Sequence, residues 1–304
     1  MDGGSVRKSA IAGSWYPADP KILQANIADY FQLVPEHRIS GRIIGLVAPH
    51  AGYMYSGQIA AHAYKQVQGQ AFDAVIVIGP SHRIPFHGVS AYNRGGYETP
   101  LGVVPVDDRL ADQIMVESRV VSATPHVHRE EHSIEIQLPF LQAALGNFSF
   151  VPLLMGSQDR RTCEELAQAI ASAVGGKNVL LVGSSDLSHF HSYDQAVKMD
   201  AVALAYLDKM EHDAFLKDLG NRVFEACGGG PVAVVMMAAK KLGAHRSKLL
   251  KYANSGDVTG DRRSVVGYAA AVFYAGEQKG KTDDRTRLRE GAGAGLTGVI
   301  KKFF

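Results

Sequence analysis

The chain has 304 residues, of which 46% are hydrophobic and 20% charged, with 32 glycines and 12 prolines. This composition is typical of a globular protein and excludes a disordered chain, a collagen and a small disulfide scaffold. The 32 basic and 30 acidic residues nearly cancel, and no basic face or RNA-binding aromatic pattern stands out, so we expect no nucleic-acid partner.

Short β-branched runs alternate with longer segments of helical periodicity. This order is typical of α/β proteins, and we predict a three-layer α/β/α sandwich with a central, mainly parallel mixed sheet. In chain order we predict helix 20–33, strand 42–48, helix 56–66, strand 73–79, helices 109–116 and 133–145, strand 148–154, helix 160–174, strand 178–184, helices 194–209 and 231–242, and strands 248–254 and 265–274. Segments 88–91 and 102–106 are predicted to form a hairpin at one sheet edge.

No repeat and no Pro- or Ser-rich linker divides this pattern, so we predict one domain over residues 1–276. Residues 277–304 are charged, then Gly-rich, then briefly amphipathic, which predicts a flexible C-terminal tail. The alternative is a docking terminus built on Leu296, Val299, Ile300, Phe303 and Phe304. No apolar run is long enough to span a bilayer and no signal peptide is visible, so we expect a cytoplasmic protein without a membrane span.

Three histidines stand just beyond the carboxyl ends of predicted strands. His50 follows GLVAP, His82 follows VIVIGPS and His189 follows VLLVGSSDLS. Open α/β sheets place their ligand sites at that rim. Each histidine alone is more often structural, but three at strand ends favour convergence of their imidazoles on one metal or catalytic centre.

Cys227 is a fourth candidate, in the turn FEACGGGP ahead of a predicted helix. The helix N-terminus and the glycine backbone would favour a thiolate, which can bind a metal or act as a nucleophile. The alternative is a buried, inert cysteine. The other cysteine, Cys163, lies in a helical run and is predicted to be a core residue, so a disulfide has no support.

The segment PHVHREEHSIEIQLPFL gathers several ionisable residues. At helical spacing, His132 and Glu135 would share a face, and with Glu131 they could transfer protons or orient a metal-bound imidazole. An exposed, charged helix start would explain the acidic residues equally well.

Several motifs in order make the chain resemble the Memo family, the B component of the AmmeMemoRadiSam system. They are AGSWYP, PHAGYMYSG, GPSH, YETPLG, EEHSIEIQLPF, SSDLSHF, CGGGP and YANSGD, within a resemblance that runs from about residue 7 to about residue 276. The family is similar in fold to class III extradiol (LigB-like) ring-cleaving dioxygenases, which use non-haem Fe(II) and O₂. Radical-SAM and AMMECR-like proteins are the partners that this resemblance implies.

The resemblance also implies roles for individual residues. His50 and His82 match the two histidine ligands of the dioxygenases, and His189 matches their catalytic histidine. Cys227 stands where the dioxygenases have a glutamate. A thiolate softens a site toward copper, zinc or thiolate-bound iron, and fold kinship does not carry activity, so ring cleavage does not follow.

Our leading hypothesis is a metal-dependent redox enzyme with a centre formed by His50, His82 and Cys227. In this hypothesis His189 is the acid/base, Asp186 orients it, and Fe(II) is the first expectation, with copper or zinc as alternatives. The remaining assignments place Trp15, Gly52, Tyr53 and Tyr97 in the pocket for a small-molecule or peptide ligand, and Glu131 and His132 around the centre. Two alternatives stay open: a metal-free thiol hydrolase with Cys227 as nucleophile and His189 as base, and a non-catalytic adaptor that binds a peptide in the same pocket.

Overall fold

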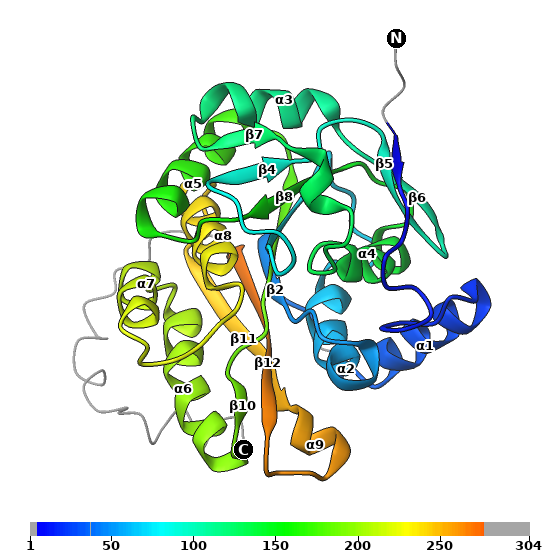
Figure 1. Ribbon diagram of the computed structural model, residues 1–304, viewed down its shortest axis with the longest axis vertical. Helices are drawn as coiled ribbons and strands as arrows, with labels where there is room; N and C mark the ends of the chain where they lie inside the picture. The colour runs from blue at the N-terminus through cyan, green and yellow to red at the C-terminus, as the bar shows by residue number, and fades with distance from the viewer. Residues whose placement is uncertain (1–4, 37, 277–304) are drawn as a thin grey trace.

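A large mixed sheet lies between two layers of helices in the computed structural model, which describes residues 5–36 and 38–276 (Figure 1). The strand order is β10-β12-β2-β9-β3-β8-β4-β7, and β11 also pairs with β12. The strands are β2 (Arg42–Ala48), β3 (Ala74–Pro80), β4 (Val89–Ala91), β7 (Val121–Ala123), β8 (Phe150–Met155), β9 (Val179–Ser184), β10 (His189–His191), β11 (Arg246–Asn254) and β12 (Val265–Ala275).

The centre of the sheet is parallel, since β2, β9, β3 and β8 run in the same direction, whereas β12 and β4 are antiparallel to their neighbours β2 and β8. Successive side chains of a strand point to opposite sides of the sheet, so the apolar strands place side chains on both faces, and helices cover both. In β3, Ile76 and Ile78 enter one core cluster while Val75 and Val77 enter the other.

In the described part of the chain, three helices contribute to the core on one face of the sheet, and five contribute to the core on the other. The first layer holds α1 (Pro20–Gln32), α2 (Tyr53–Tyr64) and α4 (Leu138–Leu145). The second layer holds α3 (Asp108–Glu117), α5 (Arg160–Val174), α6 (Tyr193–Lys209), α7 (His212–Gly220) and α8 (Gly229–Lys241). Local signals define their ends: the Asp159 side chain caps α5, and Gly175 ends it in the left-handed conformation.

A smaller sheet of β1 (Val6–Arg7), β5 (Gly96–Thr99) and β6 (Gly102–Pro105) lies beside the large one. The predicted hairpin is therefore wrong. The strand at 102–105 pairs with the adjacent strand β5 through a tight turn, while β4 joins the large sheet between β8 and β7. A short loop closes more easily than a long one, and this favours the neighbouring strand in sequence.

The α/β/α fold class is confirmed, and the predicted strands of the large sheet shift by only one or two residues. Helix α4 begins at Leu138 rather than Ser133, because a 3-10 turn over Glu135–Gln137 precedes it. Helix α7 and the small helix α9 (Ser255–Thr259) were not predicted. The predicted tail, 277–304, lies outside the described residues. No helix within the described residues has the length and apolarity needed to cross a membrane.

Candidate metal centre

The three strands β2, β9 and β3 are neighbours and parallel, so their carboxyl ends meet at one rim of the sheet. His50 lies two residues beyond β2 and His82 two residues beyond β3. The segment after β9 carries Asp186 and His189. All four residues line one cavity of about 870 Å³, as a ligand site at this rim requires.

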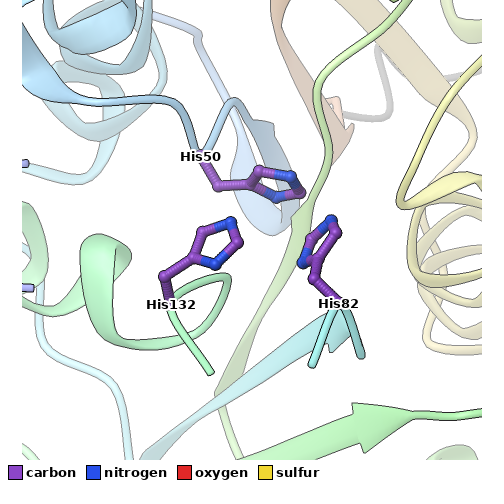
Figure 2. A group of neighbouring side chains, drawn as sticks. All are labelled: His50, His82 and His132. Carbon is purple, nitrogen blue, oxygen red and sulfur yellow. The ribbon is translucent and has the colours of Figure 1, made fainter. Parts of the chain in front are cut away.

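Three imidazoles point toward one another at the base of this cavity: His50, His82 and His132 (Figure 2). One ring nitrogen from each lies within 4.8 Å of the corresponding atoms of the other two. The ring centroids of His50 and His82 are 5.0 Å apart, and those of His82 and His132 are 4.5 Å apart. His132 thus joins the two predicted ligands as a third donor, although the sequence indicated only a supporting position.

The tautomer of His50 follows from its neighbours. The Ser184 hydroxyl donates its proton to the backbone carbonyl of Ser133 at 2.6 Å, so it can only accept from the His50 Nδ1, which lies 3.0 Å away. Nδ1 therefore carries the proton, and Nε2 keeps its lone pair. A metal-binding imidazole needs this arrangement, in which the second nitrogen is fixed by a hydrogen bond.

Glu131 holds the other two histidines. Its carboxylate accepts the His82 backbone N–H at 2.6 Å and the His82 Nδ1–H at 3.0 Å, and it also accepts the backbone N–H of His132 at 2.9 Å. Burial raises the pKa of Glu131, but its interactions with the two histidines outweigh burial and leave that pKa below its ordinary value. The carboxylate is therefore ionised, and His82 presents Nε2 to the cavity.

His132 has an unsatisfied nitrogen. Its buried Nδ1 lies 3.2 Å from a Glu131 oxygen but without the alignment of a hydrogen bond, and it has no other partner among the described residues. The ring of Trp15 lies 4.3 Å from the His132 ring, centroid to centroid, and covers one side of it. A buried nitrogen without a hydrogen-bond partner, in a group of three imidazoles that face one another, fits a metal-binding site.

Burial lowers the pKa of two of these imidazoles. The pKa of His50 lies well below its ordinary value because of burial and the neighbouring His132 and His82 rings. The pKa of His132 falls to about 4, again mainly through burial, although Glu131 opposes the change. Neutral imidazoles are the form that binds a metal, so the donor set fits a first-row divalent ion.

Cys227 lies next to this cluster but has a different character from the one expected. Its Sγ is 3.0 Å from Nε2 of His50. Burial raises the pKa of the thiol well above its ordinary value, and the Asp186 carboxylate raises it further, so the surroundings without a metal ion favour the thiol over the expected thiolate. The adjacent Gly228 is needed for space, because a Cβ there would overlap the carbonyl oxygen of Ser184.

Asp186 supports His50 rather than His189. One carboxylate oxygen accepts the His50 backbone N–H at 2.8 Å, and burial raises the pKa of this carboxyl group to about 7. The backbone N–H of His189 is instead bonded to Glu225 at 3.1 Å. The expected orientation of His189 by Asp186 is therefore not what the structure shows, although both residues face the cavity.

Two of the four predicted pocket residues line the cavity, Trp15 and Gly52. Tyr53 and Tyr97 lie outside its lining. The hydroxyl of Tyr53 donates to the carbonyl of Ile136 in the core, and the buried ring of Tyr97 lies under the Arg7 guanidinium, with its hydroxyl 2.6 Å from Nδ1 of His128.

Arg7 and Glu135 form a buried ion pair that sequence reasoning missed. Their side chains meet at 2.6 Å, and Arg7 also donates to the backbone carbonyls of His128 and Glu131. Glu135 thus faces the N-terminal segment rather than sharing a face with His132. The pairing joins residues more than 120 positions apart, so no local pattern could have indicated it.

Comparison with known proteins places the chain among close relatives. A family model described as Memo-like protein matches residues 7–272. A MEMO1 family protein of Methanothermobacter thermautotrophicus is 38% identical over 273 residues, which cover 87% of this chain and 99% of the relative. One from Methanobrevibacter smithii is 39% identical over 280 residues, covering 88% and 99%.

A solved structure of an uncharacterized protein from Escherichia coli K12 is similar in fold alone. Its TM-score is 0.51 at 12% sequence identity, and the superposition covers 76% of this chain and 100% of that chain.

Proposed function

The chain belongs to the Memo-like family, and from this membership and the geometry of its rim histidines we propose that it is a metal-dependent redox enzyme. The observation that carries the proposal is the convergence of three imidazole nitrogens within 4.8 Å at the base of a cavity. Two of these imidazoles are oriented by hydrogen bonds that leave Nε2 unprotonated, and the third has an unsatisfied nitrogen.

His50 and His82 would hold the ion, with His132 and Cys227 as candidates for the next ligand. Imidazole donors suit iron, copper and zinc, and a thiol nearby favours the softer metals among them once it is deprotonated. Fe(II) is our first assignment and copper the second. Such an ion would supply Lewis-acid or one-electron chemistry at a ligand oxygen.

His189 would move protons in this site. It lines the cavity, and burial lowers the pKa of its imidazole, so at neutral pH the ring is uncharged and can accept a proton. Glu225 accepts the backbone N–H of His189, and the imidazole interacts with the backbone of Leu187.

The test is metal content, measured anaerobically by mass spectrometry on protein purified without chelator or a nickel column. We expect about one ion per chain in the wild type, loss of the ion in His50→Ala and in His82→Ala, and retention in the control His245→Ala, whose exposed side chain lies away from the cavity. Equal metal content in all four proteins would overturn the proposal.

Two further variants identify the next ligand and the proton-transfer residue. If His132 is a ligand, His132→Ala weakens binding while Cys227→Ala does not, and the reverse holds if Cys227 is the ligand. His189→Ala should keep the ion and lose O₂ consumption with a panel of catechols and small thiols, by about 10²- to 10⁴-fold. Loss of the ion in that variant would make His189 a ligand instead.

A cysteine nucleophile is the second candidate, and the 3.0 Å contact between Cys227 and His50 favours it. Two observations weigh against it: the raised pKa of the thiol, and the position of Cys227 outside the cavity lining. The nucleophile hypothesis predicts background metal content and inactivation by one equivalent of an alkylating reagent at Cys227.

A peptide-binding adaptor would keep its partner after the metal is removed. Radical-SAM and AMMECR-like partners stay an expectation that co-purification can test.

A further inference from the structure

The cavity above the histidines changes character from its base to its mouth. Its base is polar, formed by the three histidines and Asp186. Its exposed lining includes three large apolar side chains: Met54, 63% exposed, and Tyr55, 39% exposed, both from the first turn of α2, and Phe190, 76% exposed, from β10. Apart from His82 at the base, the other exposed lining residues are polar: Ser14, Thr259, Asp261 and Ser264. A ligand that binds at the histidines and extends to the mouth can therefore meet exposed apolar side chains there only at Met54, Tyr55 and Phe190.

Phe190 has an unusual backbone conformation. Its φ is +63°, in the left-handed region that side chains other than glycine and asparagine rarely adopt. Met210 and Arg222 share this property but lie at helix C-termini, where a left-handed residue commonly ends the helix. Phe190 lies within a strand, so helix termination does not explain it.

A β-bulge explains the left-handed backbone conformation of Phe190. In the pairing of β10 with β12, His189 faces Val266 while His191 faces Val265, and the register shifts between them at Phe190. Bulges of this kind re-aim neighbouring side chains and are common beside active sites. Here the bulge places both His189 and Phe190 in the cavity wall, one at the base and one at the mouth.

A phenylalanine is an unfavourable choice for this position on stability grounds alone. Glycine would adopt the same φ without strain, and the mostly exposed ring recovers little burial, its ring contact being with His189 at 5.7 Å. Strained residues of this kind are characteristic of functional sites. The contact that the exposed ring can still make is with a molecule in the cavity.

We propose that Phe190 is a ligand-contact residue, and that the cavity takes a ligand with a polar, metal-binding head and an apolar alkyl or aryl body. The head lies at the histidines, and the body packs between Phe190 on one side and Met54 and Tyr55 on the other. The assignment of the polar head depends on the proposed metal centre. The assignment of the apolar body depends only on Met54, Tyr55 and Phe190.

The experiment uses two probes with the same chelating head, acetohydroxamate and benzohydroxamate, titrated by calorimetry into the zinc-loaded protein. Acetohydroxamate carries a methyl group where benzohydroxamate carries a phenyl ring. The ratio of their two affinities therefore measures the contact of the ring with the apolar side chains at the mouth. We expect benzohydroxamate to bind about tenfold more tightly in the wild type. In Phe190→Gly the ratio should fall to about twofold or less, with acetohydroxamate affinity and zinc content unchanged.

Arg222→Gly is the matched control, because it replaces a side chain by glycine in the same left-handed backbone conformation, at an exposed site away from the cavity. It should keep the wild-type ratio. Phe190→Ala, with circular dichroism to verify folding, replaces the glycine variant if that variant is unfolded. An equal ratio in the wild type and the Phe190 variants would overturn the proposal.

Failure of the metal centre has a separate signature, since then neither hydroxamate binds. In that event the apolar mouth is tested on the metal-free protein with 1-anilinonaphthalene-8-sulfonate fluorescence. Severalfold weaker dye binding in Phe190→Gly than in the wild type and Arg222→Gly would support the apolar contact. Equal dye binding in the three proteins would overturn it.

Discussion

The carboxylate of Glu131 holds His82 by two bonds, at 3.0 Å to the ring Nδ1 and at 2.6 Å to the backbone N–H. The ring and the backbone of His82 are thus fixed by one side chain. The same carboxylate accepts the backbone N–H groups of His132 and Ser133, so it also holds the segment that brings the third imidazole to the cavity. Glu131 is the residue on which the geometry of two of the three donors depends.

Glu131→Gln should therefore weaken metal binding by about 10- to 100-fold, as is usual when a carboxylate that orients a histidine ligand is lost. The amide has the same size but carries no charge and offers one acceptor instead of two. Zinc affinity measured by chelator competition checks this. Glu130→Gln, an exposed neighbour, is the control and should bind zinc as the wild type does. Unchanged affinity in Glu131→Gln would show that the backbone alone orients His82.

Arg7→Met should destabilise the protein by about 3 to 5 kcal/mol, because it leaves the buried Glu135 carboxylate without its counter-ion. The matched control is Lys8→Met. Lys8 also pairs with a carboxylate, Glu98, but at the surface, so its loss should change the free energy of unfolding by less than about 1 kcal/mol. Urea unfolding measures both variants. Similar values for the two would show that the hydrogen bonds of Glu135 to other groups compensate for the lost arginine.

His128 should make stability depend on pH. Burial, with a contribution from Arg7, lowers the pKa of its imidazole from 6.5 to about 3, so the folded state excludes a proton that the unfolded chain binds. Its stabilising contribution is complete above pH 6.5 and is lost as the pH falls from 6.5 to 3, by up to about 1.4 kcal/mol per pH unit. Unfolding free energies between pH 8 and 4 should fall less steeply in His128→Gln than in the wild type.

The control for that titration is His245→Gln, since His245 is exposed. It should keep the wild-type slope. Parallel slopes in His128→Gln and the wild type would show that His128 does not contribute to the pH dependence.

Gly267→Ala should destabilise the protein by about 1 to 3 kcal/mol, because a Cβ at Gly267 would overlap a carboxylate oxygen of Asp200. Asp200 accepts the backbone N–H of Ser188, next to His189, so the change should also displace the His189 segment. Adding Asp200→Ala should cost less than the sum of the single changes. Gly220→Ala, where nothing crowds the new methyl group, is the control. Additive effects in the cycle would contradict the steric explanation.

The sheet and two of the metal-binding candidates follow from local patterns in the sequence. Apolar runs at 42–48, 73–79 and 178–184 have the length and β-branched content of buried parallel strands. A residue two positions beyond such a strand has little freedom, because the strand delivers it to the rim. His50 and His82 could therefore be predicted to converge before any neighbour of theirs was known.

Tertiary structure alone brought His132 to the other two imidazoles and buried the thiol of Cys227 beside them. His132 follows no strand, and its position depends on the bonds of Arg7 to the carbonyls of His128 and Glu131, across more than 120 residues of sequence. The pKa of Cys227 depends on burial and on Asp186, which a turn sequence does not reveal. Patterns with a period of two or 3.6 residues report which face of an element is buried. They carry no information on which distant segment packs there, and that packing sets the electrostatics of the site.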